Sequence, residues 1–500
     1  MVALKISSEQ LSSVDELIGL MLKRAGVPGG ALAIVLGRTT LYSRGFGYRD
    51  VAHKSPVTPE TVYPIASTTK PINATLLAML AQEGRLDWDT PVRHYLPQFA
   101  LRDPVASVRT TVRDLVTMRT GLPRHDWLFI GNELSRAELV AGLAHLEPSA
   151  DFRQCFQYCN LTATAAGHVA EIVTGERWES LVRSRILRPL GMRGTRFARP
   201  ARGNVTCSYH ENRRRQLVQS PRFPSPATAP SGGAIHSTVT DMARWVAFNL
   251  GRGSAGRRRL IDPQVLAQIH APQVVIGERA LAPLPADASY GLGWVIQHYQ
   301  GELCLSHGGN TQQVNSSVMF FPKRQIGFVS FTNFASVALA ELMNLHVFDL
   351  FNGSTPVRSL EQSLAVYEEQ VARVRARNAS QVSQAKTRPS HPLRTYTGTY
   401  RHAAYGEIKI QSRGRALWLS RPRFTLPLKH WRYETWLAKS DSMWPVHQPH
   451  AFDGAHPIQF EMDACGDICA LSIPFEPEVA PIRFEKEGRR PHARQVRLGV

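Results

Sequence analysis

Residues 62–80 read VYPIASTTKPINATLLAML, and this stretch decides how the chain folds. A strand-like apolar run ends at Ala66, and a run with helical character follows within a few residues. Pro71 lacks a backbone N–H, which a helix tolerates only near its first turn, so a helix is predicted over residues 68–83. The segment is apolar enough to be buried, which predicts that Lys70 lies inside the protein.

Ser67 and Lys70 are three residues apart at the mouth of this helix, so both side chains are expected on one helix face. A buried Lys must be paired or neutral. A neutral Lys can take the proton of a Ser hydroxyl, which then attacks a carbonyl carbon. A chain of this length holds about two Ser-x-x-Lys strings by chance, so the motif alone does not establish catalysis.

Two further motifs follow in the chain, YCN at residues 158–160 and HGG at residues 307–309. The first precedes an apolar run, and the second precedes β-type runs at residues 318–321 and 326–331. Taken singly, Tyr-x-Asn is more typical of a turn with a packed Tyr, and His-Gly-Gly of a turn at a strand end. Their order and wide separation, combined with the Ser-x-x-Lys motif, favour one composite active site.

In these motifs the chain resembles the serine β-lactamase and penicillin-binding-protein superfamily, in particular its class C-like esterases, D-peptidases and related hydrolases. The signatures of that family are Ser-x-x-Lys, Tyr-x-Asn, and Lys-Thr-Gly or its His-x-Gly variant. The resemblance covers about residues 12–350. Four supporting stretches are similar to family segments: GFGYRD (45–50), LVTMRTGLPRHD (115–126), PLGM (189–192) and PSGG (230–233).

The resemblance implies acyl transfer through a covalent ester on Ser67. Lys70 would be the first base, and Tyr158 would relay a proton to the leaving group and help to activate the deacylating water or amine. The oxyanion hole is implied at the backbone N–H groups of Ser67 and Asn310. Asn160 would hold Lys70 and the substrate amide, and no metal or cofactor is implied. The implied substrate-binding residues are Asn160, His307, Gly308, Gly309 and Asn310.

His307 stands where β-lactamases and carboxypeptidases carry a Lys. That Lys is a permanent cation facing the substrate carboxylate, whereas an imidazole titrates near neutrality and can donate or accept a hydrogen bond. The departure argues against penicillin hydrolysis and cell-wall carboxypeptidase activity, and relatives with His here favour esterase, D-peptide hydrolase or acyl-transfer activity. His307 is expected to contact the substrate or Tyr158; in the alternative interpretation it only hydrogen-bonds the Tyr or Ser of the site.

The 500 residues are 43% hydrophobic and 20% charged, enough for large cores and two or three domains. Within residues 11–355, strand-like runs lie on both sides of a helical stretch, and helices are also predicted at residues 11–25 and 337–350. This pattern predicts an α+β fold: a β-lactamase/transpeptidase-like antiparallel sheet with a helical subdomain. Residues 356–392 are predicted to be a helical linker. Residues 393–487 alternate in short runs between turns, which predicts an all-β antiparallel barrel, similar to the lipocalin-like C-terminal barrel of some of these hydrolases. Residues 488–500 form a basic tail.

Aromatic and cysteine residues of the barrel region leave two questions open. Trp431, Tyr433 and Trp436 either line a ligand mouth or fill the barrel. Cys465 and Cys469 could close a hairpin, although free thiols are favoured in a cytosolic chain. The spacing of the six cysteines matches no zinc site.

The formal net charge is +19 and the isoelectric point is about 10. Arg clusters at residues 213–215, 257–259 and 489–497 lie in separate segments without interleaved aromatics, which favours solvated loops over nucleic-acid binding. No apolar run is long enough to span a membrane, and the N-terminus has no basic region followed by an apolar stretch, so a cytoplasmic protein is predicted. The expected partner is a small-molecule or peptide substrate, and homo-oligomerisation is left open.

Together these features predict a serine hydrolase that forms an acyl-enzyme from an ester or amide, including peptides that contain D-amino acids. The same acyl-enzyme could pass to an amine or alcohol, which would make the protein an acyltransferase or a peptide-cyclising thioesterase. A non-catalytic scaffold or binding protein with a vestigial site is the remaining alternative, and the presence of all three motifs argues against it.

Overall fold

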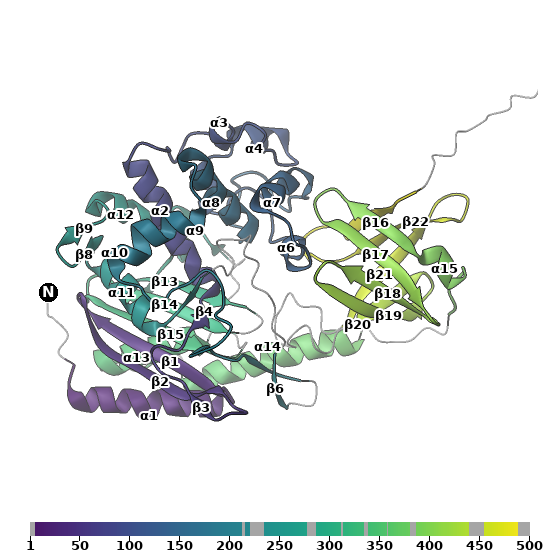
Figure 1. The fold of residues 1–500 in the computed structure, drawn as a ribbon. Helices are drawn as coiled ribbons and strands as arrows, with labels where there is room; N and C mark the ends of the chain where they lie inside the picture. The colour runs from purple at the N-terminus through teal and green to yellow at the C-terminus, as the bar shows by residue number, and fades with distance from the viewer. Residues whose placement is uncertain are drawn as a thin grey trace, which may run out of the picture.

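The computed structural model describes residues 6–212, 216–220, 235–277, 287–311, 314–334, 339–357, 359–380, 387–439 and 455–488. Within these residues an N-terminal α+β unit, which we call the N-terminal domain, contains a nine-stranded antiparallel sheet, and a C-terminal unit closes into an eight-stranded antiparallel barrel (Figure 1). The α+β fold class with a C-terminal all-β barrel is therefore confirmed. No helix in the described ranges has the length and apolar character needed to cross a membrane.

The sheet joins the two ends of the N-terminal domain. Strand β1 pairs on one side with β2, its neighbour in the chain, and on the other with β15, from Gly30 opposite Thr332 to Leu36 opposite Ile326. In spatial order the strands are β10 (Val274–Val275), β11 (Ser289–Tyr290), β12 (Val295–Tyr299), β13 (Glu302–Asn310), β14 (Asn315–Phe321), β15 (Ile326–Thr332), β1 (Gly29–Leu36), β2 (Thr39–Asp50) and β3 (Ser55–Pro56).

Strand β1 separates two hydrophobic cores, because its side chains alternate between the two faces of the sheet. Ala31, Ala33 and Val35 belong to the core that includes α11, and Leu32 and Ile34 belong to the core that includes α1 and α13. This two-sided burial explains why the strand reads as a continuous apolar run in the sequence. The covering helices are α1 (Ser8–Arg24), α11 (Val239–Leu250) and α13 (Leu339–Asn352).

The helical region between β3 and β10 surrounds the buried helix α2. Asn73 of α2 accepts a hydrogen bond from the Trp178 indole at 2.8 Å and donates to the Ala163 carbonyl at 3.2 Å, which fixes α2 to two neighbouring helices. The helices here are η1 (Ala66–Thr68), α2 (Thr69–Gln82), α3 (Val92–Tyr95), α4 (Pro104–Arg109), α5 (Val112–Val116), α6 (Trp127–Ile130), α7 (Arg136–Gly142), η2 (Leu143–His145), α8 (Asn160–Thr174), α9 (Trp178–Val182), η3 (Arg183–Leu187), α10 (Arg188–Leu190) and α12 (Pro263–Ile269). Short strand pairs are β4 (Tyr63–Pro64) with β7 (His236–Ser237), β5 (Tyr209–Glu211) with β6 (Leu217–Gln219), and β8 (Ser254–Ala255) with β9 (Arg258–Arg259).

Capping residues set the helix starts. Helix α1 begins before the predicted residue 11 because Ser7 and Gln10 form a reciprocal capping box. Helix α11 starts after Thr238, whose side chain accepts a hydrogen bond from the backbone N–H of Asp241 at 3.1 Å. A capped helix start is the structure that the sequence STVTDMARW predicts at this position.

The barrel core is aromatic. Trp436 lies buried against Tyr396 and Phe460, with ring centroids 4.5 Å and 5.1 Å away, so it fills the barrel. Tyr433 is exposed, and the Arg432 guanidinium lies over the Trp431 ring. The barrel strands are β16 (Gly398–His402), β17 (Gly406–Arg413), β18 (Ala416–Arg421), β19 (Phe424–Arg432), β20 (Thr435–Lys439), β21 (Ala455–Met462), β22 (Ile468–Ile473) and β23 (Ile482–Lys486); the short helix α15 (Leu393–Tyr396) precedes them.

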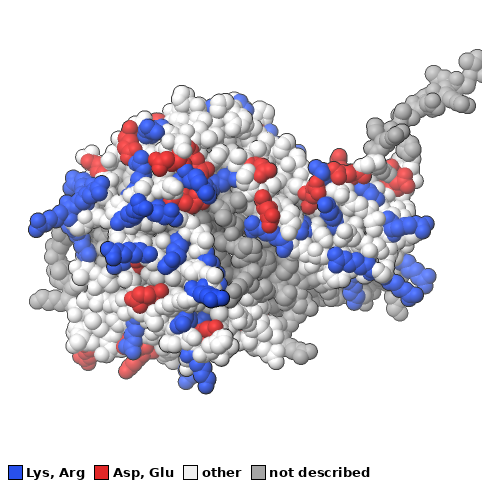
Figure 2. Space-filling view, viewed as in Figure 1, with Lys and Arg blue, Asp and Glu red and all other residues white. Residues whose placement is uncertain are grey.

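Helix α14 (Leu360–Ser380) occupies most of the predicted linker, and in Figure 1 it runs from beneath the N-terminal domain to the near edge of the barrel. All six cysteines, including Cys465 and Cys469, are free thiols. On the face shown in Figure 2, Lys and Arg are spread over both units with Asp and Glu between them. Of the Arg clusters, residues 213–215 and 489–497 lie outside the described residues, as does the PSGG stretch at 230–233.

A stacked pair of rings joins α13 to the sheet. It allows a test of the hydrophobic core that includes α1 and α13. Phe348 stacks on Phe321 with ring centroids 3.8 Å apart. We predict that Phe348→Ala lowers the free energy of unfolding by about 3–5 kcal/mol, because it removes buried surface and leaves a cavity. Denaturant unfolding measures this, with Leu20→Ala on the exposed side of α1 as the control. A loss no larger than that of the control would contradict this packing.

Candidate active site

Ser67 lies where β4 passes into η1 and α2, and the backbone around it is tightly held. Ala66, the preceding residue, has φ +48°, a strained conformation for a residue with a side chain. The Ser316 hydroxyl donates to the Ile65 carbonyl at 2.8 Å. A Cβ on Gly309 would lie 2.4 Å from the Ile65 oxygen and 3.1 Å from the Ser67 nitrogen, so glycine allows strand β13 to approach the Ser67 backbone closely.

Lys70 is buried one helical turn behind Ser67. Its Nζ lies 2.9 Å from the Ser67 Oγ and donates to the Asn160 Oδ1 at 2.7 Å. Burial, reinforced by the Arg124 guanidinium, lowers the pKa of Lys70 well below its usual value, and the Asp126 carboxylate opposes this shift. The neutral amine is therefore far more accessible here than on a solvated lysine, which is the form that a general base requires.

Tyr158 belongs to the same site. The Lys70 Nζ lies 4.6 Å and the Arg124 Cζ 4.9 Å from the centroid of its ring, and the Ser67 hydroxyl is close enough to favour its ionised form. Burial raises the pKa of Tyr158, while the Arg124 charge opposes the rise. The environment therefore moves the two pKa values in opposite directions, which suits Lys70 as proton acceptor and a protonated Tyr158 as proton relay.

Two charged residues of the loop before α6 support these groups. The Asn160 Nδ2 donates to the Asp126 Oδ1 at 2.9 Å, and the Arg124 Nε donates to the Asp126 Oδ2 at 2.8 Å. A continuous chain of hydrogen bonds thus runs from Arg124 through Asp126 and Asn160 to Lys70. Arg124 and Asp126 both lie in the stretch at 115–126 that resembles a family segment, but the resemblance gave neither of them a role.

His307 is buried within strand β13, not in a turn at a strand end. Its Nδ1 lies 2.7 Å from the Gly308 carbonyl, which can only accept, so Nδ1 carries the proton and Nε2 accepts from the Tyr290 hydroxyl at 3.0 Å. Burial and the nearby Lys70 charge lower the pKa of His307 to about 3. The His307 and Tyr158 rings are 6.4 Å apart; the hydroxyl bonded to His307 is that of Tyr290, which no sequence motif indicated.

The remaining residues of the third motif lie along the same strand. Gly308 and Asn310 are exposed, and the Asn315 Nδ2 donates to the Asn310 Oδ1 at 2.8 Å. The fold therefore brings all three motifs, far apart in the sequence, to one place around Ser67. Among the described residues, no group of three or more His, Cys, Asp or Glu is arranged to hold a metal ion.

Comparison with known proteins agrees with this arrangement. The family model described as Beta-lactamase matches residues 14–349, and a domain of unknown function, DUF3471, matches residues 382–486. The chain is 26% identical over 421 residues to unguisins hydrolase ungD' of Aspergillus campestris, covering 79% of this chain and 76% of that protein. It is 27% identical to unguisins hydrolase ungD of Aspergillus violaceofuscus, covering 78% and 74%. It is 24% identical to protein flp of Staphylococcus aureus, covering 68% and 66%.

A solved structure has a similar fold over nearly the whole chain. The octameric penicillin-binding protein homologue from Pyrococcus abyssi superposes with a TM-score of 0.63 at 20% identity, covering 95% of this chain and all of that one. The Beta-lactamase model alone matches well over half of the sequence. This chain therefore belongs to the Beta-lactamase family, and its C-terminal barrel is a DUF3471 domain.

Proposed function

We propose that this protein is a serine hydrolase that cleaves an ester or amide through an acyl-enzyme on Ser67. The observation that carries the proposal is the position of the buried Lys70 Nζ, 2.9 Å from the Ser67 Oγ, in surroundings that favour the neutral amine. A neutral amine at that distance is within reach of the hydroxyl proton.

In the acylation step, the Ser67 Oγ attacks the substrate carbonyl carbon while its proton passes to the Lys70 Nζ. The carbonyl oxygen becomes negatively charged and is stabilised by the backbone N–H groups of Ser67 and Asn310. Support for this oxyanion site comes from Gly309, which brings strand β13 close to the Ser67 nitrogen. The leaving group receives a proton through Tyr158 and departs, and the seryl ester remains.

In the deacylation step, water attacks the seryl ester and gives its proton to the Lys70–Tyr158 pair. The Ser67 Oγ is the leaving group and regains a proton, which restores the free enzyme. Because acylation needs the neutral amine, kcat/KM should rise with pH through the titration of Lys70, and burial places that titration well below pH 10.5.

The substrate class that we propose is an ester or a peptide amide, including peptides with D-amino acids. Two relatives that carry the name unguisins hydrolase support hydrolysis as the outcome. A screen of esters and of matched D- and L-amino-acid amides, with Ser67→Ala as control, would identify the class. Adding an amine nucleophile and analysing the products would separate hydrolysis from acyl transfer.

We predict that a fluorophosphonate labels Ser67. The reagent captures an activated serine, and Ser67 combines the helix-mouth position with a hydroxyl 2.9 Å from the Lys70 Nζ. Peptide mass spectrometry locates the adduct, and pre-incubation with a substrate ester should slow its formation. An adduct on another residue, or none on protein that turns over substrate, would refute the assignment of the nucleophile.

Removal of either proton-transfer group should impair turnover without unfolding the protein. Lys70→Ala and Tyr158→Phe are each expected to lower kcat/KM on the order of 10²-fold or more, because each removes a proton-transfer group from the acylation step. Suitable controls are Lys323→Ala and Tyr433→Phe, both at exposed positions. Turnover close to wild type in either active-site variant, with circular dichroism unchanged, would count against the assigned role.

His307 is expected to set the preference against substrates with a free carboxylate. Its imidazole is neutral because burial lowers its pKa to about 3, so no fixed cation faces such a group from this position. His307→Lys should raise the ratio of kcat/KM for a carboxylate substrate to that for its methyl ester. An unchanged ratio, or a wild type whose best substrates are penicillins, would show that His307 does not govern this choice.

A further inference from the structure

The barrel meets the N-terminal domain at Trp127, the residue that follows Asp126. The Trp127 ring stacks on Phe475 of the barrel with ring centroids 4.9 Å apart and planes 16° apart. Arg421, at the end of β18, is buried and donates from Nη1 to the Trp127 carbonyl at 3.1 Å. Figure 1 shows α6, which begins at Trp127, next to the barrel. The barrel therefore contacts the chain directly after the carboxylate that accepts a hydrogen bond from Asn160.

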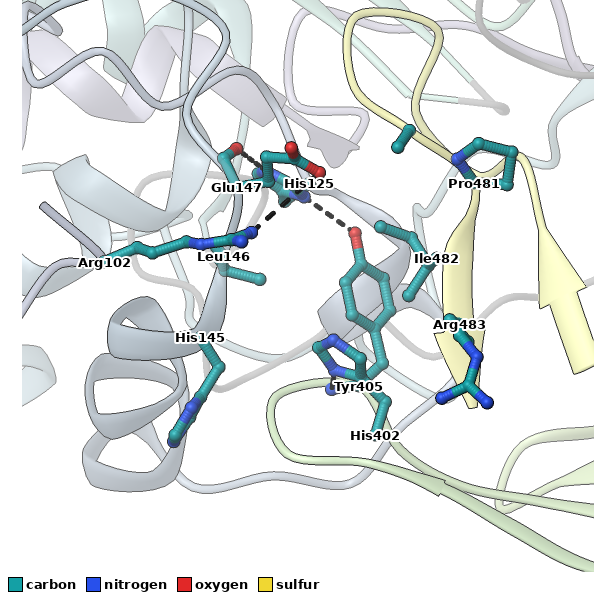
Figure 3. Close-up of a pocket in the computed structure, with 11 residues that line it drawn as sticks. Arg102, His125, His145, Leu146, Glu147, His402, Tyr405, Pro481, Ile482 and Arg483 are labelled. Atoms are coloured by element: carbon teal, nitrogen blue, oxygen red, sulfur yellow. Dashed lines mark hydrogen bonds and ion pairs between the residues drawn. The ribbon is translucent and has the colours of Figure 1, made fainter. Parts of the chain in front are cut away.

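The residue before Asp126 is also in contact with the barrel. His125 is buried and has φ +47°, a strained conformation for a residue with a side chain. In the pocket between the two units, its Nε2 lies 2.9 Å from the Glu147 carbonyl and its Nδ1 lies 2.8 Å from the Tyr405 hydroxyl (Figure 3). Because a carbonyl only accepts, Nε2 carries the proton, and in the neutral ring Nδ1 accepts from Tyr405. Burial lowers the pKa of His125, which favours this neutral form.

Tyr405 is itself fixed in the turn between β16 and β17. Its carbonyl accepts hydrogen bonds from the Arg421 Nη2 at 2.7 Å and from the Asn132 Nδ2 at 2.9 Å. Its ring stacks with Phe475, with the two planes 15° apart. Since both its main chain and its ring are held, the Tyr405 hydroxyl is a rigid partner for the His125 ring. A strained conformation persists only where its surroundings hold it, and this hydroxyl is one of the groups that hold His125.

We propose that Tyr405 is a positioning residue for acylation: by holding His125, it fixes the neighbouring Asp126 beside the active site. The Asp126 Oδ1 accepts from the Asn160 Nδ2 at 2.9 Å, and the Asn160 Oδ1 accepts from the Lys70 Nζ at 2.7 Å. The position of the loop before α6 therefore reaches the first base through two hydrogen bonds. The inference rests on the proposed acyl-enzyme function and adds to it a role for the C-terminal barrel.

The test removes one hydroxyl group with Tyr405→Phe. This variant keeps the ring and main chain of residue 405 and takes the hydrogen-bond donor from His125. We expect the rate of fluorophosphonate labelling of Ser67, and kcat/KM for p-nitrophenyl acetate, to fall by roughly 10-fold, because the amine that takes the serine proton is no longer held in place. Tyr400→Phe is the matched control and should behave as wild type. The Tyr400 hydroxyl is also buried and donates to the Tyr396 carbonyl at 2.8 Å, but this contact lies within the barrel.

A pH profile separates positioning from a general loss of stability. The charged and titratable groups that face Lys70 are Arg124 and Asp126 from the loop before α6, Tyr158 and Cys159 from the segment before α8, and His307 from β13. The Arg124 charge lowers the pKa of Lys70 more than the Asp126 charge raises it. A loop that moves away should therefore shift the acid limb of kcat/KM to higher pH. A variant that is only less stable would lose activity at every pH and keep the limb in place.

Three results would overturn the inference. They are equal labelling rates in wild type and Tyr405→Phe, a slowing in Tyr400→Phe as large as that in Tyr405→Phe, and a slower Tyr405→Phe whose acid limb has not moved. If Tyr405→Phe does not fold, His125→Gly removes the same contact at a position where glycine adopts a positive φ without strain, and it must show the same slowing and the same shift. Absence of Ser67 labelling in wild type would instead refute the proposed function.

Discussion

The burial of one lysine amine against one serine hydroxyl is the constraint on which the rest of this structure depends. An ammonium group taken out of water is costly unless it is paired or loses its proton. Helix α2 nevertheless places Lys70 inside the core. Its Nζ lies 2.7 Å from the Asn160 Oδ1 and 2.9 Å from the Ser67 Oγ. The arrangement sacrifices stability for a base that can be neutral near physiological pH, a compromise that is common at active sites.

The surrounding elements serve this contact by fixing its partners from different parts of the chain. Strand β13 can approach the Ser67 backbone because Gly309 has no side chain, and the N-terminus of α8 supplies Asn160. Asp126, in the loop before α6, accepts a hydrogen bond from Asn160, and the barrel contacts the next residue, Trp127, through the stacked ring of Phe475. Ala66, directly before Ser67, and His125, between Arg124 and Asp126, both have a positive φ, so the main chain is strained at two positions beside the site.

The features predicted correctly from the sequence are those that depend on local patterns. The helix after Ser67 and the alternating barrel strands follow from spacing and turn residues, and the motif order sufficed to bring Ser67, Tyr158 and His307 into one proposal. The hydrogen bond of His307 to Tyr290 and the stacking of Trp127 on Phe475 of the barrel could not be predicted in this way. They join residues that are far apart in the chain and belong to no pattern, and only tertiary packing brings them together.

Two local predictions were incomplete for the same kind of reason. The sequence left open whether Trp431, Tyr433 and Trp436 line a ligand mouth or fill the barrel. In the structure Tyr433 and Glu434 make a tight turn, with φ +43° at Tyr433, between the paired strands β19 and β20, and Trp436 lies in the core. The HGG motif suggested a strand end because of its glycines. It continues in β13 because Gly308 and Gly309 pair with Ser317 and Ser316 of β14, and the missing side chain of Gly309 is what the close approach to Ser67 requires.

The most direct measurement of the central claim is the titration of Lys70 itself. Protein with ¹³C in the lysine side chains can be followed by NMR across the alkaline range, and the Lys70 signal assigned by its absence from Lys70→Ala. The account predicts a pKa for Lys70 well below that of the exposed lysines, which should titrate near 10.5. A Lys70 that titrates together with the surface lysines would contradict it, because the amine would then be charged at neutral pH and unable to act as the first base.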